Sequence, residues 1–250
     1  MNAIVDDLLT QYQLVGTGKL VVLLHGWGDT SHGLQGLQTS LAADYQVLAL
    51  DLPGFGGTQA PKSVWGLDNY CEFVAHSLKK LNLDQPYALI GHSNGGAIAI
   101  RALSLGLIKP KKLVLLAAAG IRNRRHVQRF ALKVIAKTGN AATIWLPERQ
   151  RRRLRTALYG TAGSDMLVVP ELQETFKRAV RQDVQKDAAN VTVPTLLLYA
   201  KDDRAVPVAD GRRYQQLIKD SQLHIVDDAG HFVHVDQPEQ VLRAIKEFLQ

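Results

Sequence analysis

The chain has 250 residues, 46% hydrophobic and 21% charged, with a formal net charge of +7, which fits one large α/β domain with room for an inserted subdomain. Its longest apolar run, LVLLAAAGI from Leu113, is far too short to cross a bilayer, and its first residues lack the basic and apolar regions of a secretory signal. The one cysteine, Cys71, excludes an internal disulfide and fits a reducing compartment, so we expect a cytoplasmic protein without a membrane span.

Six short apolar runs predict the strands of the protein. They are continuous rather than alternating, which is typical of strands that a parallel sheet buries on both faces. Between them, helical patterns cover residues 67–81, 94–105, 210–219 and 238–249. Because strands and helices alternate, we predict βαβ units and an α/β fold with a doubly wound, mostly parallel sheet. The predicted strands start at Leu20, Tyr45, Tyr87, Leu113, Thr195 and Leu223.

One stretch, residues 121–188, interrupts this alternation with helical or loop-like sequence that shows no clear strand. It holds 15 of the 30 basic residues and 6 of the 23 acidic ones, so its formal charge is +9 while the rest of the chain carries −2. The basic excess therefore belongs to this insert. We expect residues 1–120 and 189–250 to form the core, and residues 121–188 to form a basic, mostly helical cap between two core strands.

The motif IGHSNGG, from Ile90, lies between the apolar run at Tyr87 and the helical pattern at 94–105. Its G-x-S-x-G part is also compatible with a plain glycine-rich turn, since so short a pattern recurs by chance. Between a strand and a helix, however, it is typical of a sharp turn that holds the serine in a strained conformation. The helix N-terminus there also favours developing negative charge. We therefore expect Ser93 to be a nucleophile.

A serine hydroxyl needs a base, and the base needs a carboxylate that orients it, in the chain order serine, acid, histidine. DAGHFVHV follows the last predicted strand, and we expect its first histidine, His231, to be the base and His234 to be structural. KDDRAVP follows the run at Thr195 and offers two acids, Asp202 and Asp203. The residues alone leave the choice between these two acids open.

A tetrahedral oxyanion needs preorganised hydrogen-bond donors. One donor should be the backbone N–H of Asn94, the residue after the nucleophile. The other should come from the loop LLHGWGD after the first predicted strand, where Trp27 can offer its backbone N–H and its indole can line an acyl pocket. We expect His25 and Gly26 to shape that loop rather than to take part in the chemistry.

Five segments in this order resemble the α/β-hydrolase superfamily, and the similarity runs from about Leu20 to the C-terminus. In that family the motif DxxVP after the seventh strand carries the triad acid, which selects Asp203, and the helical insert matches the position of the lid. Asn94 departs from the common form, in which Met, Leu or Gln is frequent, but its donor is a backbone group. The segments are HGWG from His25, DLPGFGGT from Asp51, GHSNGG from Gly91, AKDDRAVP from Ala200 and DAGHFVHVDQPE from Asp228.

The narrower resemblance is to the pimeloyl-acyl-carrier-protein methyl ester esterases and to generic carboxylesterases. Epoxide hydrolases and haloalkane dehalogenases use an aspartate where this chain has Ser93. The carbon–carbon bond hydrolases of aromatic degradation typically carry Trp after the triad histidine, where this chain has Phe232, which disfavours them. We expect no cofactor and no metal, because no G-x-G-x-x-G follows the first strand and no His, Cys or carboxylate cluster has metal spacing.

Together these inferences predict a serine hydrolase that cleaves carboxylic esters or thioesters of small molecules through an acyl-enzyme. PERQRRRLRTAL places Arg149, Arg152 and Arg153 on one helical face of the cap. That face is either an ordinary solvated surface or an electropositive rim that attracts anionic substrates such as esters of acyl carrier protein. We expect no nucleic-acid partner, since aromatic residues are hardly interleaved with the charges. The alternative function is a catalytically idle scaffold that binds an acidic partner through its cap.

Overall fold

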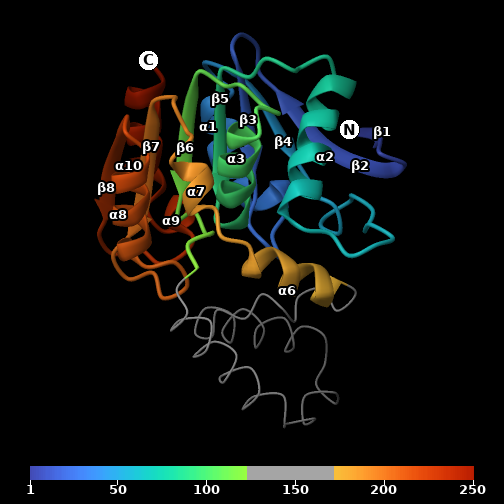
Figure 1. Cartoon of the computed structure of the whole chain (residues 1–250). Helices are drawn as coiled ribbons and strands as arrows, with labels where there is room; N and C mark the ends of the chain where they lie inside the picture. Colours follow the sequence, from blue (N-terminus) through green and yellow to red (C-terminus); the bar gives the residue numbers. More distant parts are fainter. Residues whose placement is uncertain (123–171) are drawn as a thin grey trace, which may run out of the picture.

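The computed structural model describes residues 1–122 and 172–250 (Figure 1). Its sheet contains eight strands: β1 (Asn2–Val5), β2 (Leu8–Val15), β3 (Leu20–Leu24), β4 (Gln46–Leu50), β5 (Ala88–His92), β6 (Lys112–Leu116), β7 (Thr195–Ala200) and β8 (Ser221–Val226). Their order across the sheet is β1-β2-β4-β3-β5-β6-β7-β8. β1 pairs with β2, and β2 with β4, in antiparallel fashion, while all pairings among β3 to β8 are parallel. The strand order places β3 and β5 near the middle of the sheet.

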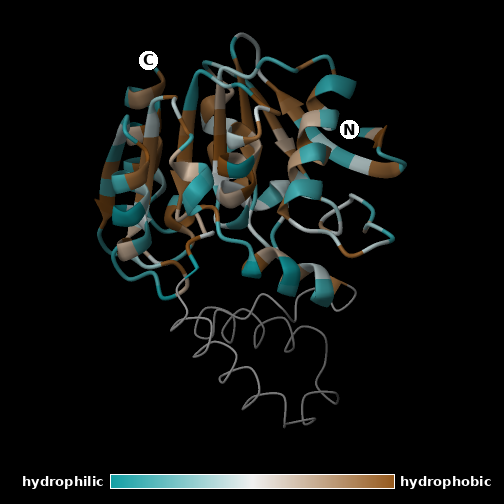
Figure 2. Cartoon of the chain, in the orientation of Figure 1, coloured by the Kyte–Doolittle hydropathy of each residue, from teal (hydrophilic) through white to brown (hydrophobic). Residues whose placement is uncertain are grey.

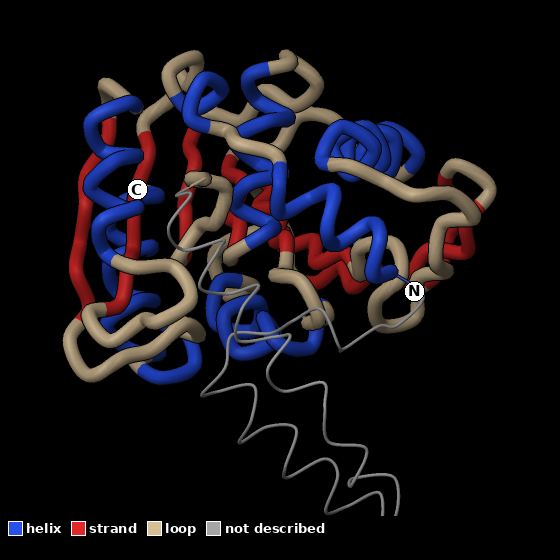
Figure 3. Tube along the Cα trace, turned by 60° about the horizontal axis from the view of Figure 1, so that its bottom comes forward, coloured by secondary structure: helices blue, strands red, loops and turns tan. Residues whose placement is uncertain are grey.

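Helices cover both faces of this sheet (Figure 1; Figure 3). One face carries α2 (Leu67–Lys80), α3 (Asn94–Ser104), α7 (Gln185–Ala188) and α8 (Val208–Leu217). The other face carries the 3-10 helix η1 (Ser31–Leu34), α1 (Gln35–Leu41), α9 (Val233–Asp236) and α10 (Pro238–Leu249). Each set packs apolar side chains against the strands, which gives two buried clusters. In Figure 2 the strands are accordingly mostly hydrophobic, while hydrophilic residues face outward on the helices.

The central strands are buried because both of their faces are apolar. All five residues of β3 and all six residues of β7 are buried. Such strands can pair only in the interior of a sheet that has helices on both sides. The predicted α/β fold with a doubly wound, mostly parallel sheet is therefore confirmed, and each of β3 to β8 overlaps an apolar run of the sequence.

The patterns in the sequence do not predict the N-terminal strands or the helices η1 and α1. In β2, buried and more exposed residues alternate, so its apolar residues form no continuous run. β1 is the edge strand and is mostly exposed. The two strands are joined at Asp6 and Asp7, which both have positive φ, and they pair with Val5 opposite Leu8. This hairpin extends the sheet beyond β4.

The described part of the predicted cap, residues 172–188, packs against the core. Its helix α6 (Gln173–Arg181) lies along the lower edge of the coloured part of the chain in Figure 1. The hydroxyl of Thr175 accepts the backbone N–H of Trp65 at 3.1 Å, and Oε1 of Gln182 accepts that of Leu67 at 2.6 Å. These bonds join the returning end of the insert to the first residue of α2 and to the segment just before it.

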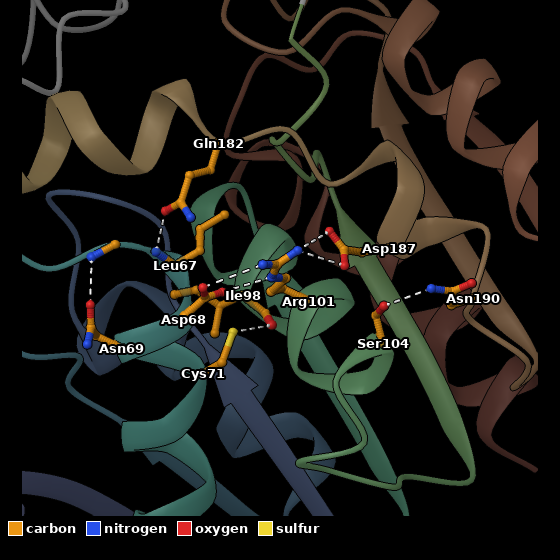
Figure 4. Close-up of polar contacts among 11 residues, drawn as sticks. Leu67, Asp68, Asn69, Cys71, Ile98, Arg101, Ser104, Gln182, Asp187 and Asn190 are labelled. Atoms are coloured by element: carbon orange, nitrogen blue, oxygen red, sulfur yellow. Dashed lines mark hydrogen bonds and ion pairs between the residues drawn. The ribbon is translucent and has the colours of Figure 1, made fainter.

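Arg101 of α3 joins three helices on the same face (Figure 4). Its Nε donates to Oδ1 of Asp68 in α2 at 2.8 Å, and its Nη1 donates to both carboxylate oxygens of Asp187 in α7 at 3.0 Å. The Asp187 side chain is almost fully buried.

The division into core and cap at residues 121 and 188 stays a prediction, because residues 123–171 lie outside the described part of the chain.

Three further observations bear on membranes, metals and thiols. No helix within residues 1–122 and 172–250 combines the length and the apolar composition that crossing a bilayer requires. In these same two ranges, no group of three or more His, Cys, Asp or Glu side chains is arranged to hold a metal ion. Cys71 is buried in α2, its Sγ donates to the carbonyl oxygen of Ile98, and burial raises the pKa of its thiol. The thiol therefore packs as part of the core.

Candidate active site

Ser93 lies at a sharp turn between β5 and α3. Its backbone has φ 50° and ψ −116°, a strained conformation for a residue with a side chain. Glycines allow the turn to close. A Cβ on Gly91 would lie 2.5 Å from the carbonyl oxygen of Gly95, and a Cβ on Gly95 would lie 2.3 Å from that of Leu24. The Ser93 side chain makes no capping bond to α3, so its hydroxyl is available to other groups.

Ser93, His231 and Asp203 are connected by hydrogen bonds. Nε2 of His231 lies 2.9 Å from Oγ of Ser93, and its Nδ1 lies 2.8 Å from Oδ2 of Asp203. A carboxylate only accepts, so Nδ1 donates to Asp203 and Nε2 is left to accept the hydroxyl of Ser93. The other oxygen of Asp203 accepts the backbone N–H groups of Ala205 and Val206 at 2.7 and 2.9 Å. These bonds hold the fully buried carboxylate toward His231.

Asp202, the other acid of the KDD sequence, is exposed. Its backbone N–H donates to the carbonyl oxygen of Ala229 at 3.1 Å, which ties the loop after β7 to the loop that carries His231. The carboxylate of Asp236 holds the same loop by accepting the backbone N–H of Gly230 at 2.8 Å. The structure thus brings Asp203 to the histidine. No pattern in the sequence marks Asp236, because its partner, the backbone N–H of Gly230, lies across a turn without a sequence motif.

The loop after β3, which contains Trp27, runs directly beside Ser93. A Cβ on Gly26 would lie 3.1 Å from Cβ of Ser93, so the backbone here can approach the serine closely. His25 braces the loop: its Nδ1 donates to the carbonyl oxygen of Gly26 at 2.7 Å, and its Nε2 accepts the backbone N–H of Leu52 at 2.9 Å. Burial lowers the pKa of His25, in keeping with this neutral form. The brace leaves His25 without a free nitrogen for the reaction.

The indole of Trp27 belongs to an aromatic cluster beside this loop. Its ring centre lies 4.9 Å from that of Phe55, 6.4 Å from that of Tyr70 and 5.0 Å from that of Phe176. Phe176 comes from α6, so the described end of the insert contributes to this wall. No pattern in the sequence marks Phe176, since its partners lie far away in the chain and its own helix shows no motif.

Comparison with known proteins identifies the family of this chain. Residues 21–244 match the Alpha/beta hydrolase family. A 2-hydroxy-6-oxo-2,4-heptadienoate hydrolase of Pseudomonas putida is 29% identical over 262 residues, which cover 94% of this chain and 90% of that protein. The solved structure of a serine hydrolase involved in carbazole degradation is 26% identical with a TM-score of 0.77, over 100% of this chain and 97% of the other.

A third similar protein is an esterase from Exiguobacterium antarcticum, which shares the fold with a TM-score of 0.80 at 19% identity, over 100% of this chain and 98% of the other. The family match extends through most of the chain, from β3 to α10. It includes all the loops that contain the candidate site residues. The resemblance inferred from the motifs is thereby confirmed: this chain is a hydrolase that belongs to the Alpha/beta hydrolase family.

Proposed function

We propose that this hydrolase is a serine esterase that works through an acyl-enzyme, with Ser93, His231 and Asp203 as its catalytic triad. The observation that carries the proposal is the pair of hydrogen bonds, 2.8 and 2.9 Å long, from Asp203 through His231 to a serine at a strained turn. An ordinary buried serine needs neither the strain nor a histidine with an oriented tautomer. A catalytic role accounts for both features.

Acylation would use this arrangement directly. Oγ of Ser93 attacks the carbonyl carbon of the ester while Nε2 of His231 takes the hydroxyl proton. The carboxylate of Asp203 stabilises the imidazolium that forms. The backbone N–H groups of Trp27 and Asn94 donate to the oxyanion of the tetrahedral intermediate. His231 then gives its proton to the leaving alcohol or thiol, and the acyl group remains on Ser93.

Deacylation would use the same atoms in reverse order. A water molecule enters where the alcohol left, and His231 removes one of its protons as the oxygen attacks the acyl carbon. The second tetrahedral intermediate collapses, His231 returns the proton to Oγ of Ser93, and a carboxylic acid departs.

A second candidate is the hydrolysis of a carbon–carbon bond in a 2-hydroxy-6-oxo dienoate. Similarity to the Pseudomonas putida hydrolase that is named for such a substrate favours it. Phe232, which stands where those hydrolases typically carry Trp, argues against it. Its side chain is 47% exposed and its ring centre lies 5.6 Å from that of His231, so it borders the candidate site. The two candidates differ in the bond that is broken, which makes substrates the deciding test.

We also propose that the substrate is anionic or linked to an acyl carrier protein. The support is the formal charge of +9 in residues 121–188 against −2 elsewhere. The arginines at 149, 152 and 153 lie outside the described part of the chain. Within the described part, α6 carries three of the insert's cations beside a pocket of about 400 Å³, which is lined by Val64, Glu174, Lys177, Arg178, Arg181 and Gln182.

Labelling with a fluorophosphonate probe tests the proposed mechanism. The wild type should be labelled, Ser93→Ala should not, and Ser40→Ala should be labelled like the wild type because the hydroxyl of Ser40 donates to the carbonyl oxygen of Gly36 within α1. Absence of label on the folded wild type would favour a catalytically idle scaffold. Hydrolysis rates for a panel of p-nitrophenyl esters of graded chain length and for 2-hydroxy-6-oxo-2,4-heptadienoate then show whether the enzyme breaks an ester bond or a carbon–carbon bond. Hydrolysis of the dienoate without hydrolysis of any ester would select the second candidate.

A further inference from the structure

His92 lies immediately before Ser93, at the end of β5, and is buried. Its Nε2 lies 3.0 Å from the backbone carbonyl oxygen of His231. The rings of the two histidines are also in contact, with their centres 4.9 Å apart. His92 therefore bridges the strand that leads into Ser93 and the loop that carries the candidate base, two segments separated by 139 residues in the chain.

The direction of this hydrogen bond follows from its acceptor. A carbonyl oxygen cannot donate, so Nε2 of His92 carries the proton. Burial lowers the pKa of His92 well below its ordinary value, and the neighbouring histidines His231, His234 and His25 lower it further. At neutral pH the ring is thus uncharged, with its single proton directed at the carbonyl group of His231.

We propose that His92 is a positioning residue for the reaction at Ser93. By donating to the carbonyl group of His231, it fixes the backbone of the base relative to the nucleophile and keeps Nε2 of His231 within hydrogen-bonding distance of Oγ. The proposal rests on the proposed function, because it needs His231 to act as the base.

The origin of this hydrogen bond distinguishes it from the other bonds to the same loop. Asp236 holds Gly230 from α9, and Asp202 holds Ala229 from the loop after β7. Neither segment carries the nucleophile. The bond from His92 starts one residue from Ser93, so it sets the separation between nucleophile and base directly. Misplacement of a catalytic group by about 1 Å can lower the rate about 100-fold.

Two variants of His92 separate the hydrogen bond from simple packing. His92→Phe keeps an aromatic ring but removes the donor. His92→Gln keeps a donor, because its Nε2 is separated from Cα by the same number of bonds as Nε2 of histidine. His234→Phe is the matched control: His234 is also buried and its ring centre lies 4.9 Å from that of His92, but the described contacts give its ring nitrogens no hydrogen bond.

With the best p-nitrophenyl ester, His92→Phe should lower kcat about 10- to 100-fold and change KM by less than about twofold, since the base moves while the substrate pocket stays intact. His92→Gln should return kcat to within about threefold of the wild type, and His234→Phe should remain within about threefold. Equal losses in all three variants would mean that the histidines only fill space. Wild-type turnover in folded His92→Phe would also overturn the proposal.

A measurement without substrate keeps this inference apart from the proposed function. Two-bond ¹H–¹⁵N correlation spectra of the ¹⁵N-labelled protein report which ring nitrogen carries the proton, and loss of one signal set in His92→Gln assigns His92. The proton should be on Nε2 of His92 in both the wild type and Ser93→Ala. A proton on Nδ1 of His92 would overturn the inference even if the protein is an active esterase. Failure of the wild type to react with probe or ester, with the proton on Nε2, would instead contradict the proposed function.

Discussion

The strained backbone of Ser93 directs its hydroxyl away from α3 and toward His231. Strain at a residue with a side chain persists only when the surroundings impose it. Here the two flanking glycines, Gly91 and Gly95, permit the close approach of neighbouring backbone, and the N–H of Ser93 donates to the carbonyl oxygen of Leu116 at 3.0 Å. The geometry of the nucleophile is therefore set by the backbone and does not depend on the serine hydroxyl.

Removal of either reacting side chain should abolish turnover without unfolding the protein. We expect Ser93→Ala and His231→Ala each to lower kcat for ester hydrolysis by about 10³-fold or more. The fold should remain because neither side chain contributes to the two apolar clusters. Steady-state kinetics and thermal unfolding check this. Retention of about a tenth of wild-type kcat in a folded variant would exclude that residue from the mechanism.

The two neighbouring acids should respond differently to the same change. Asp203→Asn removes the charge that fixes the tautomer of His231, and we expect kcat to fall about 10⁴-fold. Asp202→Asn changes an exposed side chain and should leave kcat within about twofold of the wild type. Steady-state kinetics of the two variants, measured under the same conditions, show which aspartate orients His231. The opposite ranking would show that the acid has been assigned one residue too late.

Motif order in the sequence points to Ser93 and His231, because a G-x-S-x-G turn and a histidine after the last strand are local features. The choice between Asp202 and Asp203 needed the resemblance to a family, since two adjacent aspartates in one turn cannot be told apart by local sequence alone. Phe176 and His92 act through contacts with residues far away in the chain, and Asp236 acts through a hydrogen bond across a turn. Only the folded chain shows these contacts.

At the scale of elements, the central parallel strands β3 to β7 were predictable because burial on both faces leaves a continuous apolar run. The edge hairpin was not, since β1 and β2 expose many of their residues and take their stability from pairing with each other and with β4. The short helix α1 contains glycine, serine and threonine, which are weak helix formers. Tertiary contacts determine whether such segments form a strand or a helix.

The cluster around Arg101 should contribute to stability by holding α7 on α3. Arg101→Met leaves the carboxylate of Asp187 almost buried without its cation, and we expect a loss of about 2 kcal/mol in the free energy of unfolding, reduced from the cost of a fully buried pair because Arg101 is partly exposed. Urea unfolding measures this. In the double variant Arg101→Met with Asp187→Asn the loss should be smaller, and a loss equal to that of Arg101→Met would contradict a role for the buried charge.

The N-terminal turn of α8 should make stability depend on pH through Asp210. Burial, together with the negative charge of Asp203, raises the pKa of Asp210 to about 6. Since this folded-state pKa lies above the unfolded value, the stability contributed by the protonated side chain is present at low pH and is lost as the pH rises through about 6. Asp210→Asn should therefore raise the Tm relative to the wild type at neutral pH.

The advantage of Asp210→Asn should shrink as the pH falls from about 6 toward about 4, because the wild-type carboxyl is then protonated in the folded protein and no longer buries a charge. Thermal unfolding of both proteins across this range provides the check. A difference in Tm that stays constant over the whole range would show that Asp210 titrates normally in the folded protein.

At the scale of the whole molecule, charge is divided unequally between the insert and the rest of the chain. If the insert recruits anionic substrates, replacing Arg149, Arg152 and Arg153 with Gln should raise KM for an acyl-carrier-protein ester. The increase should shrink with added salt, because such attraction is screened over about 10 Å at 0.1 M. Turnover of a small neutral ester is the control and should be nearly unchanged. Equal effects on both substrates would leave these arginines as a solvated surface.

The separation of the site residues along the chain has a consequence for protein synthesis. Ser93 and the glycine turn are translated early, but the candidate base follows 138 residues later and near the end of the chain. Its loop comes after β8, and α10 fastens the same end through the bond from the Tyr87 hydroxyl to the carbonyl oxygen of Leu249. Non-local contacts of this kind form late in folding. If Ser93 and His231 act as proposed, a nascent chain therefore carries Ser93 without its base and has no hydrolase activity until the loop after β8 has docked.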